Sequence, residues 1–506
     1  MFNTKILCLG NNSDDTDTRV SILATQDETI NHGLIENDLF VPINVGYYHT
    51  SIADISSGGI VRLSVHFDTV IMLDQPYEEW SHWKILTSTI KLMDHLREQG
   101  INVIYENNVN VTQSKSILNL LDNGSFCIYP WILHTMAHTM EGKKVSLCAR
   151  SSSIIATEDK LGDWRTDKTY TKIRESMLKG EKLPKLCMAC YEQEEKGIES
   201  YREFETKEWI SKLNLHDIQD LNSIKHPYYY ELRLNNKCNI ACRGCRPSHS
   251  SRIEKEYKKF DIQYPYNESW EYSEIGIIDI NTLTPKSRVY LTGGEPTVMN
   301  EVYAFMEECI KKGKTDFDFT IGTNATKIRE RFFELSKHFT NMNFSVSIDG
   351  HGKINDYWRW GSNWDSVILN TKRLESLGHT ISINCVPGIY NVTNLHLLLE
   401  FLDETFPKAG LYLQINFNEL HSAFNHPNAD LVVESMKRCR NTKMYYTDGK
   451  SVKTCIDSLL EHYKNNPDCN IKNLKKFFEY NDKQDQARNI RLIDYIPELE
   501  ECRKYI

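Results

Sequence analysis

Hydrophobic positions between residues 225 and 420 repeat one pattern. A short apolar or alternating run, which fits a strand, is followed by a stretch with apolar residues at helical spacing. The predicted strands are Tyr228–Leu234, Val289–Leu291, Phe317–Ile321, Phe344–Ile348, Ile381–Cys385 and Leu411–Phe417. Six strand-to-helix units in sequence predict an α/β fold whose parallel sheet forms a partial (β/α)6 barrel of the TIM type.

Three cysteines follow the first of these strands in the spacing C-x3-C-x2-C. They are Cys238, Cys242 and Cys245, and the next helix is predicted to begin with a capping box of Ser251 and Glu254. Thiolates bind both zinc and iron–sulfur clusters, but a closed zinc site takes four protein ligands, whereas three ligands leave one position open. A zinc knuckle and three unrelated reduced thiols remain the alternatives.

Polar residues also follow the later strands, at what would be one end of the barrel. The carboxyl ends of barrel strands carry the active site in folds of this type. The second strand leads into a turn in which two glycines allow close backbone approach and a carboxylate can accept from an ammonium group. The candidate residues are Gly293, Gly294, Glu295 and Pro296 in this turn, then Asn324, Ser347, Asp349 and Arg359. Taken singly, such residues are more often a plain turn, strand-end caps and a surface arginine.

Together, the three cysteines and the Gly-Gly-Glu-Pro turn resemble the signature of the radical SAM superfamily. The resemblance implies a 4Fe-4S cluster on Cys238, Cys242 and Cys245 with S-adenosylmethionine bound at the open iron. It also implies that the Gly-Gly-Glu-Pro turn approaches the amino group of S-adenosylmethionine, Asn324 its carboxylate and ribose, and Ser347, Asp349 and Arg359 other parts. One departure is Gly244, since the family usually has a large residue before the third cysteine, where it packs near adenine.

The region from 123 to 207 holds a second group of cysteines: Cys127, Cys148, Cys187 and Cys190. A C-x2-C pair and one cysteine on each side of a short hairpin can form a four-thiolate site, for which zinc and iron–sulfur are equally suited. The order of motifs resembles the SPASM/twitch domain, with Cys127 before an aromatic residue, Gly142 before Cys148, and Gly180-Glu181 before the C-x2-C pair. This resemblance implies one auxiliary iron–sulfur cluster of the 4Fe-4S type, in a domain that here precedes the barrel.

The remaining segments complete a four-domain prediction. Residues 1–122 are expected to form an accessory α/β domain of unknown role, with no phosphate-binding loop after its first strand. Its predicted elements are the strands Lys5–Leu9, Thr69–Leu73 and Ile101–Tyr105 and the helices Lys84–Glu98 and Ser114–Leu121. The auxiliary domain covers 123–207, the barrel 225–420, and a helical C-terminal region 421–506.

Composition restricts the partners. The net charge of −9 gives no general attraction to nucleic acid or membranes, so neither is expected. No apolar run reaches membrane-spanning length, and the start of the chain lacks the apolar core of a signal peptide. Fourteen cysteines without an export signal indicate reduced thiols and metal ligation in a cytoplasmic protein.

The resemblance implies an enzyme that reductively cleaves S-adenosylmethionine and abstracts hydrogen through a 5′-deoxyadenosyl radical, supplied by an electron donor such as flavodoxin or ferredoxin. Many SPASM/twitch enzymes modify a peptide or protein side chain, which is the expected substrate class. The alternatives are radical SAM oxidation or rearrangement of a small molecule or nucleotide, and a non-catalytic metal-binding scaffold. The sequence indicates no catalytic acid, base or radical-quenching residue.

Overall fold

A computed structural model gives the fold. It describes residues 5–9, 20–26, 29–30, 32–36, 39–43, 69–72, 102–105, 124–139, 142–148, 151, 154–157, 168–195, 200–213, 221–265, 271–413, 420–444, 452–465 and 471–506. The chain divides into two compact units. The first comprises Met1–Ile132, Arg150–Ser153 and Gly162–His226, and the second comprises Leu133–Ala149, Ile154–Leu161 and Pro227–Ile506.

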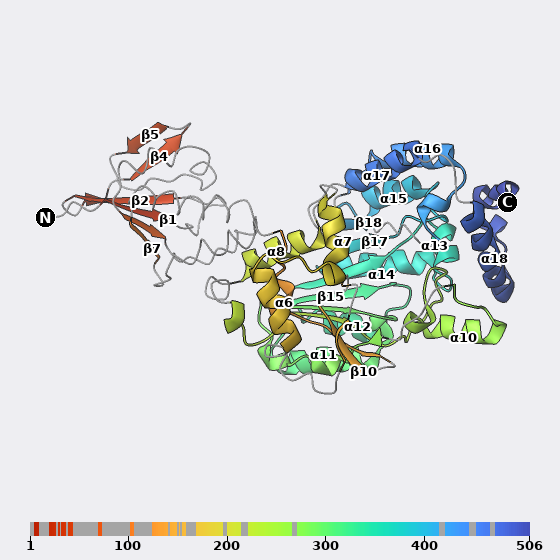
Figure 1. Ribbon diagram of the computed structural model, residues 1–506, viewed down its shortest axis with the longest axis horizontal. Coiled ribbons are helices and arrows are strands. Elements are labelled where there is room, and N and C mark those ends of the chain that lie inside the picture. The colour runs from red at the N-terminus through yellow and green to blue at the C-terminus, as the bar shows by residue number, and fades with distance from the viewer. Residues whose placement is uncertain are drawn as a thin grey trace. The chain divides into compact units, whose positions relative to one another are not determined.

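The second unit is built on a seven-stranded sheet with the order β18-β17-β16-β15-β14-β12-β8 (Figure 1). Its strands are β8 (Leu133–His134), β12 (Tyr229–Arg233), β14 (Arg288–Thr292), β15 (Asp318–Thr323), β16 (Met342–Ser347), β17 (Thr380–Cys385) and β18 (Gly410–Leu413). Every neighbouring pair is parallel. The predicted α/β fold with a parallel sheet is therefore confirmed, and it is consistent with a partial TIM barrel.

Helices follow the strands as the periodicity predicts. They are α10 (Ser251–Phe260), α11 (Asn300–Lys311), α12 (Glu330–Ser336), α13 (Lys353–Trp358), α14 (Trp364–Ser376) and α15 (Leu395–Thr405). Alternate strand residues such as Val289, Phe319 and Phe344 are fully buried, in one core with Val302 and Met306 of α11. One face of the sheet thus packs on helices, as the period of two along each strand requires.

The other face of the sheet is polar and half-buried. Parallel register sets Glu231 beside Tyr290, Tyr290 beside Thr320, and Thr320 beside Asn343. All four residues have intermediate exposure, whereas their neighbours along each strand are buried. The loops that leave the carboxyl ends of β12, β14, β15 and β16 carry the candidate residues, so the topology brings these loops to one edge.

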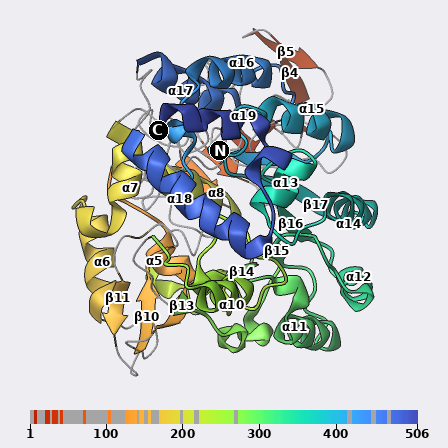
Figure 2. The ribbon, with the colours of Figure 1, turned by 90° about the vertical axis from the view of Figure 1, so that its right-hand side faces the viewer.

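The C-terminal region adds α16 (Ala429–Cys439), α17 (Val452–Asn465), α18 (Ile471–Arg488) and α19 (Pro497–Glu500). Figure 2 gives the view in which α18 can be followed along its length. Phe477 and Leu499 share a buried cluster with Ile354 and Tyr357 of α13. The last helices therefore pack against the barrel unit.

Short 3₁₀ turns connect several of these elements. In the second unit they are η4 (Pro247–His249), η5 (Ile275–Ile277), η6 (Ile280–Thr282), η7 (Pro296–Val298), η8 (Ala423–Asn425), η9 (Leu492–Asp494) and η10 (Glu501–Tyr505). A separate sheet, ordered β11-β10-β9-β13, contains the predicted hairpin. Its strands are β9 (Met136–Thr139), β10 (Gly142–Ser146), β11 (Ile154–Thr157) and β13 (Glu271–Tyr272).

The first unit contains a five-stranded sheet, β3-β2-β1-β6-β7, and a β4-β5 pair. The strands are β1 (Lys5–Leu9), β2 (Val20–Gln26), β3 (Thr29–Ile30), β4 (His32–Glu36), β5 (Leu39–Ile43), β6 (Thr69–Met72) and β7 (Asn102–Tyr105). The predicted helices Lys84–Glu98 and Ser114–Leu121 lie outside the described residues. The unit also contains α5 (Tyr129–Ile132), α6 (Lys168–Leu178), α7 (Pro184–Glu195), α8 (Tyr201–Lys212) and η3 (Leu221–Ser223).

The predicted capping box of Ser251 and Glu254 at the start of α10 was wrong. The N-cap is Ser250, whose hydroxyl accepts from the backbone N–H of Ile253 at 3.4 Å. Ser251 already lies within the helix, and its hydroxyl accepts from the backbone N–H of Cys238 at 3.3 Å. The two adjacent serines thus serve the helix and the cysteine loop respectively.

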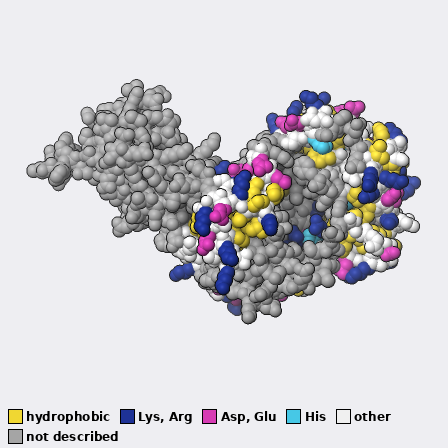
Figure 3. Space-filling view, viewed as in Figure 1, with side chains coloured by type: hydrophobic (Ala, Val, Ile, Leu, Met, Phe, Trp, Pro, Cys, Tyr) yellow, Lys and Arg dark blue, Asp and Glu magenta, His cyan; other side chains and the backbone are white. Residues whose placement is uncertain are grey.

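Surface charge is mixed where the structure describes side chains. Figure 3 shows Lys and Arg side chains interspersed with Asp and Glu side chains on the coloured part of one face. Within the described residues, no helix combines the length and apolar character needed to cross a membrane.

Candidate active site

The cysteine loop leaves β12 and is tied by its backbone to two other segments. The backbone N–H groups of Ala241 and Arg243 donate to the carbonyls of Trp360 and Trp358 at 2.7 and 2.8 Å. The N–H of Cys245 donates to the carbonyl of Cys242 at 3.1 Å, which closes the turn between the second and third cysteines. These bonds fix the loop beside the residues that follow α13.

The Gly-Gly-Glu-Pro turn lies directly against this loop. The N–H of Gly294 donates to Asn235 at 2.9 Å, and the N–H of Glu295 donates to the carbonyl of Lys237 at 2.9 Å. A Cβ added to Gly294 would lie 2.3 Å from that carbonyl oxygen. Gly293 has a φ of +117°, and a Cβ added there would lie 2.8 Å from the backbone N and O of Leu234. Both glycines are therefore needed for the turn to approach the loop.

Glu295 joins this turn to the end of β15. Its side chain is 1% exposed, and its oxygens accept from Thr297, Thr323 and Asn324. The shortest of these bonds are 2.6 Å, from the Thr297 hydroxyl and from the Asn324 backbone N–H. Burial raises the pKa of the Glu295 carboxyl, while these hydrogen bonds oppose the rise. The contact of this carboxylate with an ammonium group stays a prediction.

Asn324 lies between the turn and the first cysteine. Its Nδ2 donates to the Asn239 side chain at 2.8 Å and lies 4.0 Å from the sulfur of Cys238. Its Oδ1 accepts from the N–H of Thr326 at 2.9 Å, which holds the side chain in place. Asn324 is thus brought to the cysteine loop, as its position after the third predicted strand required.

Asp349 and Arg359 form an ion pair, with 2.6 Å between Oδ2 and Nη1. The other carboxylate oxygen of Asp349 accepts from the N–H of Val386 at 2.9 Å. Ser347 is half-buried at the end of β16, opposite Asn384 of β17. The structure thus pairs two of the predicted cofactor residues with each other. Contacts of Ser347, Asp349 and Arg359 with a cofactor stay predictions.

The three thiols share one electrostatic environment. Burial is the largest cause that raises the pKa of each, to about 12 for Cys238. Cys242 raises the pKa of both other thiols, and the Arg359 guanidinium lowers all three. The three cysteines therefore lie within electrostatic range of one another and of one cation. Burial disfavours the thiolates that metal ligation requires, and the charge of Arg359 favours them.

The donors available on the cysteine loop are three thiols. Among the described residues, no three Cys, His, Asp or Glu side chains are arranged to hold one metal ion. In an iron–sulfur cluster each cysteine bonds its own iron, so the ligand sulfurs need not converge on one point. Three partly buried thiols on one loop, beside Arg359, can therefore serve an iron–sulfur cluster.

The four cysteines of the predicted auxiliary site are divided between the units. Cys127, Cys187 and Cys190 belong to the first, and Cys148 follows β10 in the second. Within the first unit, Cys190 and burial raise the pKa of Cys187 to about 11, and Arg202 lowers it. Arg202 donates to the carbonyl of Phe126 at 2.5 Å and pairs with Glu194. A shared site for the four thiols stays a prediction.

Two contributors to the site were missed in the sequence. Arg243, between the second and third cysteines, is fully buried and paired with Asp485 of α18. Trp358 lies against Gly244, where an added Cβ would be 3.4 Å from the indole Nε1. Only the helical spacing of Phe477, Tyr480 and Gln484 along α18 indicated a buried face, and nothing in the sequence linked that face to the cysteine loop.

Comparison with known proteins agrees with this geometry. Residues 232–402 match the family model of the radical SAM superfamily. The chain carries a radical SAM domain. The matched segment holds the cysteine loop, the Gly-Gly-Glu-Pro turn, Asn324 and the Asp349–Arg359 pair. A radical SAM domain indicates an enzyme and implies a 4Fe-4S cluster and S-adenosylmethionine.

Individual relatives of the radical SAM domain are distant. Molybdenum cofactor biosynthesis protein 1 of Drosophila melanogaster is 22% identical over 163 residues, which cover 32% of this chain and 27% of that protein. The Streptococcus suis SuiB structure bound to S-adenosylmethionine is 15% identical, with a TM-score of 0.30 over 57% of this chain and 53% of that one. The anSMEcpe structure with bound AdoMet is 14% identical, with a TM-score of 0.32 over 43% and 60%. The chain thus spans about a quarter of the curated relative and just over half of these structures.

Proposed function

We propose that this protein is a radical SAM enzyme that reductively cleaves S-adenosylmethionine and abstracts a hydrogen atom from its substrate. The observation that carries the proposal is the close packing of the cysteine loop against the Gly-Gly-Glu-Pro turn, inside the segment that matches the family. A plain zinc knuckle would not require Gly294 to touch the carbonyl of Lys237. The joined loops instead bring the three thiols and the backbone of the turn to one edge of the sheet.

Cys238, Cys242 and Cys245 are the proposed cluster ligands. When bound, a 4Fe-4S cluster with one open iron supplies the electron that splits S-adenosylmethionine into methionine and a 5′-deoxyadenosyl radical. Arg359 places a positive charge near all three thiols and so favours their ionised form. Flavodoxin or ferredoxin is the proposed class of electron donor.

The residues at the strand ends are proposed to bind S-adenosylmethionine. The backbone of Gly293, Gly294, Glu295 and Pro296 would receive its amino group. The carboxylate of Glu295 acts first as the brace that holds this backbone, because it accepts from Thr297, Thr323 and Asn324. The amide of Asn324 would donate to the cofactor carboxylate or ribose. Ser347 and the Asp349–Arg359 pair would form the wall beyond it, which positions the cofactor and excludes water.

The proposed substrate is a peptide or protein side chain, and Cys127, Cys148, Cys187 and Cys190 are proposed to hold one auxiliary 4Fe-4S cluster. The order of motifs in residues 123–207 supports both parts, since it resembles the SPASM/twitch domain. Four thiolates would leave no open iron, so this cluster would accept an electron from the substrate radical and would not bind substrate itself.

A small-molecule substrate is the second candidate. It is favoured by the similarity of part of this chain to molybdenum cofactor biosynthesis protein 1, whose name refers to a small cofactor. Equilibrium binding of free small metabolites, measured beside binding of peptides, separates the candidates. Affinity for a small metabolite with none for peptides would reject the peptide class.

The test of the proposed activity is anaerobic reconstitution followed by turnover. The protein should contain about eight irons if both clusters have four. With reductant and S-adenosylmethionine it should form 5′-deoxyadenosine, and Cys242→Ala should abolish this product. The double variant with Cys187→Ala and Cys190→Ala should lose about half the iron. Stoichiometric zinc without cleavage would instead identify a non-catalytic scaffold.

A further inference from the structure

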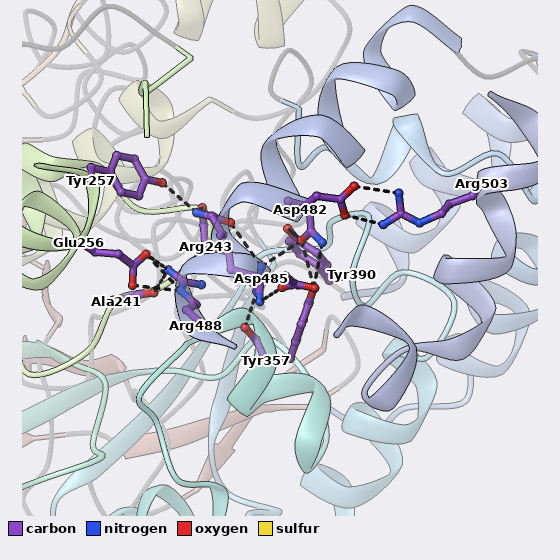
Figure 4. Close-up of polar contacts among 12 residues, drawn as sticks. Ala241, Arg243, Glu256, Tyr257, Tyr357, Tyr390, Asp482, Asp485, Arg488 and Arg503 are labelled. Carbon is purple, nitrogen blue, oxygen red and sulfur yellow. Dashed lines mark hydrogen bonds and ion pairs between the residues drawn. The ribbon is translucent and has the colours of Figure 1, made fainter. Parts of the chain in front are cut away.

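Arg243 lies inside the cysteine loop but points away from the sheet edge into the C-terminal helix α18. Its side chain is 0% exposed, and its guanidinium is 3.6 Å from the ring centroid of Tyr357 (Figure 4). Nε donates to the Tyr357 carbonyl at 2.9 Å, Nη1 to the Asn481 side chain at 3.1 Å, and Nη2 to Asp485 at 2.5 Å. The planar fork thus has an acceptor on each of its three nitrogens.

This arrangement is specific to an arginine opposite a carboxylate. A buried guanidinium is tolerated only when an opposite charge and further acceptors satisfy it, and removal of either partner leaves an uncompensated charge. Asp485 supplies the charge, and the Tyr357 hydroxyl also donates to its Oδ1, at 3.0 Å. Asn481 accepts in addition from the Tyr390 hydroxyl at 2.8 Å. The position of Arg243 is therefore set by α18 together with Tyr357 and Trp358 at the end of α13.

A second tether from the same helix holds the other side of Cys242. Arg488, close to one turn beyond Asp485, donates from Nη2 to the carbonyl of Ala241 at 3.0 Å and pairs with Glu256 of α10 at 2.8 Å. Gln484, directly before Asp485, donates to the Tyr257 hydroxyl at 2.8 Å and accepts from Nη1 of Arg243 at 3.4 Å. One face of α18 thus forms hydrogen bonds with the residues on both sides of Cys242.

We propose that α18 positions the cysteine loop, with Arg243 and Asp485 as positioning residues for Cys242. This rests on the proposed function only in that Cys242 is taken as a cluster ligand. The residues on both sides of Cys242 are held by α18, through the bond of Arg488 to the Ala241 carbonyl and the bond of Arg243 to Asp485. The bonded residues are about 240 positions apart in the chain. Without these contacts the loop would still follow β12, but Ala241 and Arg243 would lose their hydrogen bonds to α18.

The test is hydrogen exchange of the loop in the full-length, iron-free protein. Asp485→Asn removes the charge opposite Arg243 at nearly constant shape, and Asp482→Asn is the matched control. Asp482 lies on the same helix but pairs with Arg503, on the side away from the loop. We expect amides of residues 241–245 to exchange at least tenfold faster in Asp485→Asn, and at the wild-type rate in Asp482→Asn.

Arg243→Lys separates position from charge. It keeps the charge but cannot reach the three acceptors at once, so it should also speed exchange at residues 241–245. After iron loading, the electron paramagnetic resonance spectrum of the reduced protein with S-adenosylmethionine should change in Asp485→Asn and not in Asp482→Asn. A loss of overall stability alone would not alter that spectrum in the folded fraction.

Equal loop exchange in Asp485→Asn and Asp482→Asn would overturn the proposal. If Asp485→Asn does not fold, Gln484→Met provides the same comparison. It removes the bonds of Gln484 to the side chain and the carbonyl of Arg243, and the bond to Tyr257, while the charge of Asp485 stays in place. The exchange result does not depend on iron or turnover. Failure of the wild-type protein to form 5′-deoxyadenosine would therefore reject the proposed activity and leave the positioning role to be decided by exchange.

Discussion

Glu295 illustrates how a buried carboxylate can be retained at a functional edge. It is 1% exposed, and the donors around it come from both the turn after β14 and the end of β15. Burial penalises its charge, but each donor replaces part of the lost hydration. The side chain thus links two loops that carry predicted cofactor residues, so its loss should affect both.

Glu295→Gln should destabilise the barrel unit. Glutamine has one acceptor oxygen and brings an NH2 group toward the donors of Thr297, Thr323 and Asn324, so at least one buried donor loses its partner. An unsatisfied buried group costs about 1–3 kcal/mol. Denaturant unfolding of the iron-free protein measures this loss. The control Glu334→Gln alters an exposed pair with Lys337 and should change stability by less than about 0.5 kcal/mol. Equal effects of the two variants would contradict the stabilising role of the buried Glu295 carboxylate.

Residue types with a unique chemistry could be predicted from the sequence, whereas residues that act through distant partners could not. Cys238 and Gly294 could be singled out in the sequence, because few residue types can serve as a metal ligand or fit against a backbone carbonyl. Arg243 is indistinguishable from any loop arginine until folding places Asp485 beside it. For Gly244, which departs from the family pattern, only the structure shows the neighbour: Trp358 lies against its backbone.

At the scale of elements, the period of apolar positions was sufficient for the sheet. Strands β14 to β17 appear close to the predicted ranges because their buried side chains alternate, and the helices between them follow the predicted faces. The edge strand β8 was missed, since its two residues are too few to show a period. The cap of α10 was misplaced by one residue because Ser251, with Glu254 three residues later, fits the capping-box pattern, whereas the N-cap Ser250 is followed by Ile253 at that spacing.

Gly294→Ala should separate the cysteine loop from the Gly-Gly-Glu-Pro turn. The added Cβ would lie 2.3 Å from the carbonyl oxygen of Lys237, and backbone on both sides prevents an easy shift. Overpacking of this kind costs about 1–3 kcal/mol. We expect a lower melting temperature and less iron retained after reconstitution than in the wild-type protein.

The control for this variant is Gly276→Ala. Nothing lies within 4 Å of a Cβ added at Gly276, so the same chemical change should leave iron content and melting temperature unaltered. Full iron retention in Gly294→Ala would mean that the contact between turn and loop is dispensable. Loss of iron in both variants would point to a general effect of alanine and not to this contact.

At the scale of the whole molecule, neutral buried histidines make the barrel unit sensitive to acid. Burial lowers the pKa values of His134, His421 and His426 to about 4 each. Unfolding restores the ordinary value of about 6.5. As pH falls from 6.5 toward 4, the unfolded chain binds protons that the folded chain does not, so stability is lost in this window.

His421→Phe should flatten this pH dependence. The imidazole lies among the rings of Tyr390, Phe477 and Tyr480, and the nearby Arg243 charge adds to the effect of burial. Its Nε2 has no hydrogen-bond partner among the described residues, so phenylalanine gives up little there. Between pH 7.5 and 5, a histidine with this shift loses about 2 kcal/mol of stability. Denaturant unfolding of the iron-free protein at both values should show the variant losing that much less than wild type, whereas the exposed His338→Phe should lose as much as wild type. Parallel losses in all three proteins would mean that His421 is protonated in the folded state.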